Sequence, residues 1–228
     1  MLIGGLQKTT LVDYPGKVAA TVFTLGCSFR CHFCHNPELV IPEQFNPIMP
    51  MNEIMDFFKS RVGKLEAVCI TGGEPTVQKD IGQFIIDLKK MGFLIKLDTN
   101  GTMSDILQKL IDARNINYIA MDIKGPIERY GEITATKGFE EKIKQSVKII
   151  MESGIPYEFR TTIAKPLHSV DDFKGIGELI KGSDLYYIQN FVRSKHVDDK
   201  MTLQSFTKDE LAQCLAVIKT YVTKSFIR

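Results

Sequence analysis

Short runs of apolar and β-branched residues alternate along the chain with longer segments of helical periodicity. The apolar runs are continuous rather than alternating, which is typical of parallel strands buried on both faces. They predict six strands, at Val18–Leu25, Ala67–Thr71, Leu94–Asp98, Tyr118–Ile123, Tyr157–Ala164 and Leu185–Val192.

The segments between these runs carry apolar residues at spacings of three and four, as expected of amphipathic helices. One helix is expected over about residues 52–64, with Ile54, Phe57 and Phe58 buried. The other stripes are Ile81, Phe84, Ile85 and Leu88; Ile106 or Leu107 with Leu110 and Ile111; Phe139, Ile143, Val147 and Ile150; and Leu211, Leu215, Ile218 and Val222. Two pairs have the spacing of a capping box and predict helix starts: Ser169 with Asp172, and Thr207 with Glu210.

Strand and helix alternate six times from Val18 to Arg228, at about 35 residues per unit, a comfortable length for a β-loop-α-loop unit. Repeated βα units form either an open doubly wound sheet or a barrel. An eight-unit barrel needs about 250 residues, so a barrel built from 228 residues would be partial. We expect one α/β domain over residues 1–228, with 1–17 as an N-terminal extension and 18–228 as the six units.

Composition and charge exclude several classes of protein. The chain is 44% hydrophobic and 25% charged, as in ordinary globular proteins, and 29 basic against 27 acidic residues leave a net charge of +2. This balance gives no electrostatic reason to expect nucleic acid or an anionic membrane as partner. The longest apolar run is far shorter than the roughly 20 residues of a membrane span. Met1–Leu6 lacks the basic start of a secretory signal, so we expect a cytoplasmic protein.

Three of the five cysteines lie close together, in Cys27-Ser28-Phe29-Arg30-Cys31-His32-Phe33-Cys34, directly after the first predicted strand. An odd count with this clustering indicates a metal in a reducing compartment rather than a disulfide framework. Three thiolates suit a 4Fe–4S cluster with one iron left open. A structural zinc site is the alternative, with His32 or His35 as its fourth ligand.

Polar residues follow the ends of the next strands, and in α/β folds the binding and catalytic residues lie at these carboxyl ends. The second predicted strand ends in Thr71-Gly72-Gly73-Glu74-Pro75, in which glycines allow close backbone approach and Glu74 offers a carboxylate to an ammonium. The third ends in Asp98-Thr99-Asn100-Gly101. A glycine turn and an Asx turn are the corresponding structural alternatives.

The fourth and fifth predicted strands carry charged pairs at i, i+2, which lie on one face of a strand. The pairs are Asp122 with Lys124 and Glu158 with Arg160. Buried charges are costly unless they are paired or used, so they indicate either a site or a structural ion pair.

The remaining cysteines and histidines have structural explanations. Cys69 lies inside a predicted strand and Cys214 on the last helix, and both are expected to be packed in the core. His168 and His196 lie in predicted loops, where the pattern indicates no partner.

The spacing Cys27-x-x-x-Cys31-x-Phe33-Cys34, with the aromatic Phe33 before the last cysteine, resembles the signature of the radical S-adenosylmethionine superfamily. The resemblance implies a partial (β/α)6 barrel of TIM type. It also implies that Cys27, Cys31 and Cys34 hold a 4Fe–4S cluster whose open iron binds S-adenosylmethionine, which is cleaved to a 5′-deoxyadenosyl radical.

The resemblance also assigns residues to S-adenosylmethionine. Gly72, Gly73 and Glu74 match the motif that contacts its amino group. Asp98, Thr99, Asp122 and Lys124 match residues that line its pocket. Phe33 and Arg160 complete the set of expected cofactor-binding residues.

Two further segments are similar to activases of glycyl radical enzymes: Cys34-His35-Asn36-Pro37 and Leu11-Val12-Asp13-Tyr14-Pro15-Gly16. The longer segment Gly5–Gly16 is most similar to activating proteins of anaerobic ribonucleoside-triphosphate reductase. The resemblance implies a glycyl radical enzyme as partner, this reductase before others, and flavodoxin or ferredoxin as electron donor. A pyruvate formate-lyase-type activase and a radical enzyme acting on a small molecule, such as a deazaguanine synthase, are the alternatives.

Overall fold

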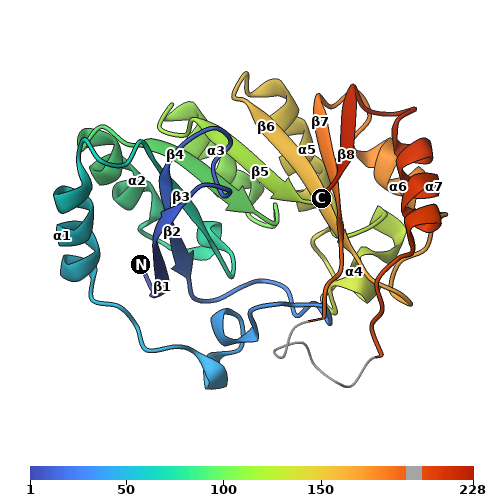
Figure 1. Cartoon of the computed structure of the whole chain (residues 1–228), viewed down its shortest axis with the longest axis horizontal. Coiled ribbons are helices and arrows are strands. Elements are labelled where there is room, and N and C mark those ends of the chain that lie inside the picture. The colour runs from blue at the N-terminus through green and yellow to red at the C-terminus, as the bar shows by residue number, and fades with distance from the viewer. Residues whose placement is uncertain (194–201) are drawn as a thin grey trace. The chain divides into compact units, whose positions relative to one another are not determined.

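The computed structural model describes residues 1–193 and 202–228, which form an α/β fold (Figure 1). Eight strands follow one another in the sheet in the order of the sequence, and β1 and β8 are the two ends of that order. The sheet is therefore not closed as an eight-unit barrel would be. The strands are β1 (Ile3–Thr10), β2 (Ala19–Thr24), β3 (Ala67–Gly72), β4 (Leu94–Thr99), β5 (Tyr118–Asp122), β6 (Tyr157–Ile163), β7 (Leu185–Asn190) and β8 (Lys224–Ile227).

A helical segment follows each of the strands β2 to β7. The α-helices are α1 (Met51–Arg61), α2 (Ile81–Lys90), α3 (Ser104–Asp112), α4 (Tyr130–Ile133), α5 (Glu140–Glu152), α6 (Asp172–Leu179) and α7 (Lys208–Ile218). Short 3-10 turns are η1 (Pro37–Leu39), η2 (Pro42–Gln44), η3 (Pro75–Val77) and η4 (Ile127–Arg129). The six predicted βα units are thus confirmed, and with them the partial-barrel fold class.

Two strands, β1 and β8, are absent from the sequence prediction. β1 lies in the predicted N-terminal extension, pairs antiparallel with β2, and buries only Ile3 and Thr10. β8 pairs with β7 and buries only Ser225. Both are edge strands with an interrupted apolar pattern, so neither carries the continuous apolar run that predicts a central strand.

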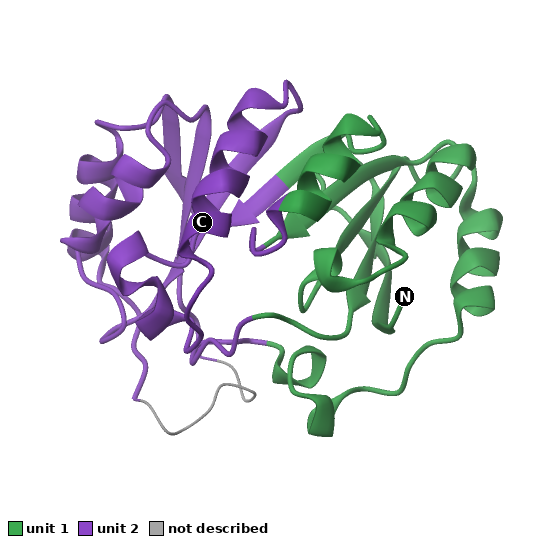
Figure 2. Ribbon diagram, turned by 180° about the vertical axis from the view of Figure 1, so that it is seen from behind, with its two compact units in different colours: residues 1–28, 36–99, 105–119 green, residues 29–35, 100–104, 120–228 purple. Residues whose placement is uncertain are grey.

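The chain forms two compact units, coloured separately in Figure 2. Unit 1 comprises residues 1–28, 36–99 and 105–119. Its strands β2, β3 and β4 are parallel and in register, and its core includes Ile70, Leu97, Phe58, Ile85 and Leu88, all buried. The helices of this unit bury most of their predicted apolar stripes, but Phe57 of α1, predicted to be buried, is only half-buried.

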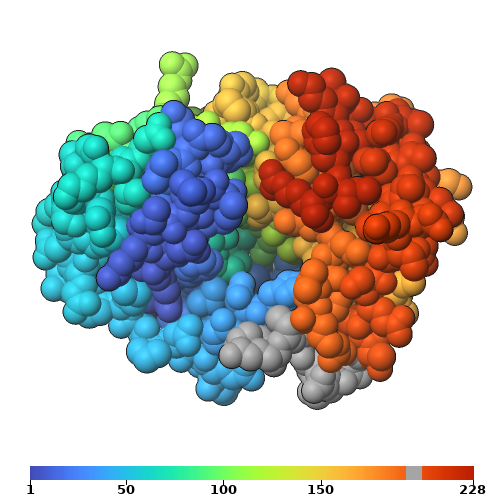
Figure 3. Space-filling model, in the orientation of Figure 1, coloured from blue at the N-terminus to red at the C-terminus, as the bar shows by residue number. Residues whose placement is uncertain are grey.

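Unit 2 comprises residues 29–35, 100–104 and 120–228. Here β6, β7 and β8 are parallel, and Phe159, Tyr186 and Ile188 are fully buried. The last strand lies at the surface of this unit, as the dark red atoms in Figure 3 show, and Phe226 and Ile227 on it are exposed.

One predicted capping box is confirmed and the other is wrong. Thr207 and Glu210 form a reciprocal capping box at the start of α7. Helix α6 begins only at Asp172, and its carboxylate accepts hydrogen bonds from the Ser169 backbone N–H at 2.8 Å and from Arg129 at 2.7 and 2.8 Å. The Ser169 hydroxyl also donates to Asp172, at 3.2 Å, so the predicted pair does interact, but the N-cap of α6 is Asp171 and not Ser169.

In the described part of the chain, no helix is both long enough and apolar enough to cross a membrane.

Candidate cofactor site

Cys27 lies just beyond the end of β2 in unit 1, where the backbone is fixed by hydrogen bonds. Gly26 has a φ of +92°, which favours glycine, and its N–H donates to the Leu39 carbonyl at 2.7 Å. The Gly26 carbonyl accepts the Glu74 N–H at 2.8 Å. The turn before Cys27 is thus tied directly to the Gly-Gly-Glu-Pro turn that follows β3.

That second turn requires its glycines. Gly72 has a φ of +123°, and a β-carbon on it would lie 2.2 Å from the Thr24 backbone nitrogen. A β-carbon on Gly73 would lie 2.1 Å from the Gly26 carbonyl oxygen. The two strand ends therefore approach too closely to admit a side chain at either glycine, and the Gly73 N–H donates to the Thr24 carbonyl at 2.9 Å.

Glu74 and Thr99, from the ends of β3 and β4, are brought together within unit 1. The Glu74 side chain is only 1% exposed, and one carboxylate oxygen, Oε1, accepts the Thr76 N–H at 3.0 Å, the Thr76 hydroxyl, and the Thr99 hydroxyl at 2.7 Å. These bonds offset the cost of burying the carboxylate and fix its orientation. Glu74 also serves as the N-cap of η3.

Asp98 is held by a buried lysine that the sequence analysis did not single out. Lys96, two residues earlier on β4 and 2% exposed, forms an ion pair with the Asp98 carboxylate. Its Nζ also lies 3.9 Å from the Cys69 Sγ, since Cys69 and Lys96 are register partners on β3 and β4. Cys69 is buried, as expected, but beside an ammonium rather than among apolar groups alone. Cys214 is also buried, and burial raises the pKa of its thiol to about 11, so it is a packing residue.

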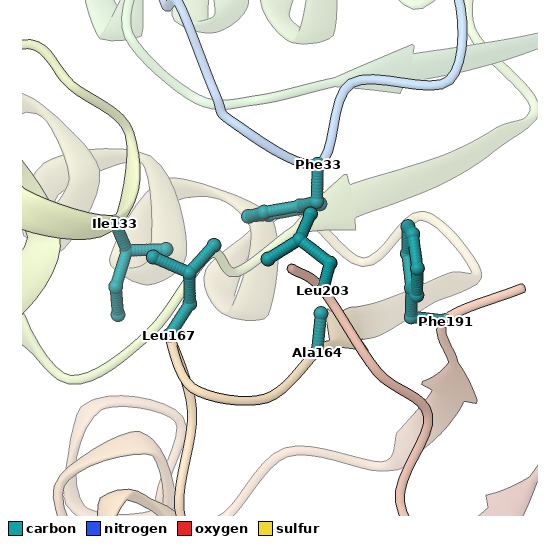
Figure 4. Close-up of a cluster of buried hydrophobic side chains, with 6 residues drawn as sticks. All are labelled: Phe33, Ile133, Ala164, Leu167, Phe191 and Leu203. Atoms are coloured by element: carbon teal, nitrogen blue, oxygen red, sulfur yellow. The ribbon is translucent and has the colours of Figure 1, made fainter. Parts of the chain in front are cut away.

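In unit 2, the segment carrying Cys31 and Cys34 is anchored by two phenylalanines. Phe29, 1% exposed, packs its ring 5.9 Å from that of Tyr130. Phe33 is buried among Ile133, Ala164, Leu167, Phe191 and Leu203 (Figure 4). The Cys34 N–H donates to the Cys31 carbonyl at 3.1 Å and closes a tight turn between them.

The fold brings three predicted residues of unit 2 together around one carboxylate. Asp122, at the end of β5, accepts a hydrogen bond from the Arg160 Nε at 2.6 Å and from the Lys124 Nζ at 3.2 Å. Arg160 lies on β6, and its NH1 is also 3.9 Å from Glu158. The predicted i, i+2 pairs thus form one network across two strands.

The pKa of Asp122 follows from this network. Burial alone would raise the pKa of the carboxyl, but the positive charges of Arg160 and Lys124 outweigh burial and hold the pKa well below its ordinary value. The carboxylate is therefore charged at any physiological pH.

A pH dependence of stability follows from the depressed pKa of Asp122. The contribution of this ionised carboxylate is complete above the unfolded-state pKa of about 3.9 and is lost as the pH falls through the folded-state value. We expect Asp122→Asn to lower the free energy of unfolding by about 1–2 kcal/mol at neutral pH, and this difference to shrink below about pH 4. Denaturant unfolding of both proteins across the acid range measures it. A carboxyl titration midpoint for Asp122 above 4, by carbon NMR, would contradict the assignment.

Two further residues contact Lys124 of this network: Tyr130, which the sequence does not indicate, and His168, for which the sequence indicates no partner. His168 is buried and contacts the Lys124 carbonyl, and Tyr130 contacts the Lys124 N–H. These contacts join positions 6 and 44 residues apart in sequence, so only the folded chain reveals them. His196, also noted in the sequence, lies outside the described residues.

The three cysteines of the sequence motif differ from the other two in exposure. Cys27, Cys31 and Cys34 are each partly exposed, whereas Cys69 and Cys214 are buried. Across residues 1–193 and 202–228, no three His, Cys, Asp or Glu side chains are grouped in a metal-binding arrangement. The chemistry of three accessible thiols within eight residues nevertheless fits a cluster with three protein ligands.

Comparison with known proteins identifies the class. The Radical SAM superfamily matches residues 21–180, and the chain therefore belongs to this superfamily. The chain is accordingly an enzyme whose superfamily uses a 4Fe–4S cluster and S-adenosylmethionine.

Among its relatives, the chain is 30% identical to a Methanocaldococcus jannaschii protein assigned by name as a glycyl-radical enzyme activating enzyme, over 100% of this chain and 95% of the relative. It is 32% identical to a 7-carboxy-7-deazaguanine synthase of Thermoplasma acidophilum, over 55% of this chain and 54% of that protein. Its fold is similar to the crystal structure of Streptococcus suis SuiB, with a TM-score of 0.67 and 14% identity, over 91% of this chain and 48% of SuiB.

Proposed function

We propose that this chain is a glycyl-radical-enzyme activase, and that its partner is an anaerobic ribonucleoside-triphosphate reductase. The observation that carries the proposal is the end-to-end similarity to a protein assigned as such an activase, in contrast to the partial overlap with the deazaguanine synthase. The segment Gly5–Gly16 supports the choice of the reductase. The proposed setting is the cytoplasm, with flavodoxin or ferredoxin as the electron donor.

The thiolates of Cys27, Cys31 and Cys34 are proposed to hold the 4Fe–4S cluster. When bound, the reduced cluster supplies the electron that cleaves S-adenosylmethionine to methionine and a 5′-deoxyadenosyl radical, which takes a hydrogen atom from a glycine Cα of the partner. The fixed turns before Cys27 and between Cys31 and Cys34 support this role, because a preformed loop loses little entropy on binding a metal group.

The other matching residues are proposed to bind S-adenosylmethionine. In unit 1, the turn of Gly72 and Gly73, which carries no side chains, and the buried, oriented carboxylate of Glu74 suit its ammonium group. Asp98 and Thr99 follow on β4. In unit 2, Asp122 with Lys124 and Arg160 supplies charges of both signs, and Phe33 supports the cysteine segment. Because these charged side chains are paired and hydrogen-bonded to one another, they are already oriented before the cofactor binds.

The test is radical formation on the partner. The reconstituted chain, S-adenosylmethionine, a reductant and the anaerobic reductase of the same organism are mixed without oxygen, and we expect a glycine-centred radical by EPR. The radical should depend on S-adenosylmethionine and vanish when the reductase glycine is replaced by alanine. Absence of the signal with every glycyl radical enzyme of the organism would overturn the proposal.

A second candidate function is a radical reaction on a small molecule, which the similarity to the deazaguanine synthase favours. The same mixtures separate the two functions. Cleavage of S-adenosylmethionine that is accelerated by a purine-like metabolite and not by any glycyl radical enzyme would favour the second.

A further inference from the structure

Both backbone polar groups of Lys124 are held by buried side chains. The Tyr130 hydroxyl accepts the Lys124 N–H at 3.1 Å, and the His168 Nε2 lies 2.8 Å from the Lys124 carbonyl oxygen. Tyr130 is 1% exposed and His168 2%. A backbone residue held at both its N–H and its C=O has little freedom to change its φ and ψ, so its side chain starts from a fixed position.

The hydrogen bonds of His168 define its protonation. A carbonyl only accepts, so Nε2 must carry a proton and donate it to Lys124. The Nδ1 atom accepts the Ala164 N–H at 3.2 Å. It also lies 3.3 Å from the Ala164 carbonyl oxygen, but that oxygen already accepts the His168 backbone N–H at 2.9 Å. The neutral Nε2–H imidazole thus satisfies every partner. Burial also lowers the pKa of His168, which agrees with a neutral ring.

The same two side chains contact the cysteine segment. The Tyr130 ring packs 5.9 Å from Phe29, and the His168 ring meets Phe33 edge-on, with centroids 5.6 Å apart. Phe29 and Phe33 lie on either side of Cys31 in the sequence. Phe33 in addition lies 5.9 Å below the Lys124 ammonium, and it is fixed in its apolar cluster (Figure 4).

We propose that Tyr130 and His168 are positioning residues that couple the Cys31–Cys34 segment to the Asp122–Lys124 pair. Each places an aromatic ring against one anchor of the cysteine segment and one hydrogen bond on the Lys124 backbone. A displacement of the cysteine segment is therefore transmitted to Lys124, and through its ammonium to Asp122. This proposal rests on the proposed assignment of Asp122 and Lys124 to S-adenosylmethionine, and it is independent of which substrate is attacked.

The test separates the hydrogen bonds from the rings. Tyr130→Phe and His168→Phe retain a ring against Phe29 or Phe33 and lose the bond to Lys124, whereas His168→Gln retains an N–H donor without the ring. In the loaded enzyme we expect Tyr130→Phe and His168→Phe to raise the KM for S-adenosylmethionine about five- to tenfold, with kcat within about twofold. His168→Gln should keep the KM within about twofold of the original protein, because the bond to Lys124 is retained, but should lower the iron content, because the ring against Phe33 is lost. Iron content should stay unchanged in Tyr130→Phe and His168→Phe, because the packing on the cysteine segment is retained.

A second readout uses the protein without cluster. Nitrogen NMR of the imidazole should show the neutral Nε2–H form at pH 7, and Tyr130→Phe should shift the amide signals of Lys124 and of Cys31 to Cys34. Cys214→Ala, a buried change on α7 of the same unit, is the matched control for stability and should move neither the KM nor these amides.

Three results would overturn the coupling: an unchanged KM in both phenylalanine variants, equal behaviour of His168→Gln and His168→Phe, or an Nδ1–H or doubly protonated imidazole. If no glycyl radical enzyme is activated while the KM pattern holds, the proposed function fails and the coupling stands.

Discussion

Replacement of Cys31 by alanine is expected to abolish both cluster assembly and the cleavage of S-adenosylmethionine. Two thiolates cannot hold a cubane cluster with three protein-bound irons. The wild-type protein should take up about four irons per chain on anaerobic reconstitution, and Cys31→Ala well under half of that. Iron and sulfide analysis and the yield of 5′-deoxyadenosine measure the two effects.

The fold of the Cys31→Ala protein should survive the change. Cys31 is only partly buried at the edge of the apolar cluster around Phe33, and the hydrogen bond from the Cys34 N–H goes to its carbonyl, which alanine keeps. We expect the free energy of unfolding of the cluster-free protein to fall by no more than about 1 kcal/mol. Loss of the cluster would then be due to the missing ligand rather than to unfolding.

Cys214→Ala is the matched control for Cys31→Ala. This buried thiol on α7 belongs to the same unit, and its replacement removes the same atoms without touching the cysteine segment. It should retain a full complement of iron and normal cleavage. A Cys31→Ala protein that still formed 5′-deoxyadenosine would contradict the assignment of the cluster ligands.

The sequence predicts best those features that depend on the residues of one strand alone. Parallel strands buried on both faces produce continuous apolar runs, so all six central strands could be predicted, whereas the edge strands β1 and β8 produce none. The i, i+2 spacing of Asp122 and Lys124 correctly predicted that their side chains lie together, although β5 ends at Asp122 and Lys124 follows it. That Arg160 donates to the same carboxylate depends on how β6 lies relative to β5, and no local pattern contains that information.

Buried polar residues were the hardest to predict, because their partners are distant in sequence. The sequence predicts Lys96 as part of an apolar strand, and in the structure Lys96 is buried with its charge paired to Asp98. Tyr130 and His168 gave no periodic signal, since each is defined by contacts with Lys124 and with the cysteine segment. The glycine turn could be predicted: the sequence motif indicates Gly72 and Gly73, and the close backbone contacts of the structure explain why no other residue fits there.

Gly73→Ala is expected to destabilise the protein and to impair cluster binding together. The new β-carbon would lie 2.1 Å from the Gly26 carbonyl oxygen and 2.9 Å from the Leu39 carbonyl oxygen, and both are backbone atoms that cannot rotate away. Relief requires the turn before Cys27 to move, which breaks the hydrogen bond from the Glu74 N–H to Gly26. We expect the free energy of unfolding to fall by about 2–4 kcal/mol and the iron content to fall with it.

Gly82→Ala is the control, because it is expected to raise the free energy of unfolding rather than lower it. Gly82 lies within α2 of the same unit, and a β-carbon there meets only Leu110 at 3.7 Å, an ordinary contact. Alanine is the better helix former, so this variant should gain about 0.5–1 kcal/mol in unfolding free energy and keep its cluster. Denaturant unfolding and iron analysis of the two variants side by side measure the stability and the cluster content that are compared. If Gly73→Ala proved as stable and as well loaded as Gly82→Ala, the close approach of the two turns could not be what positions Cys27.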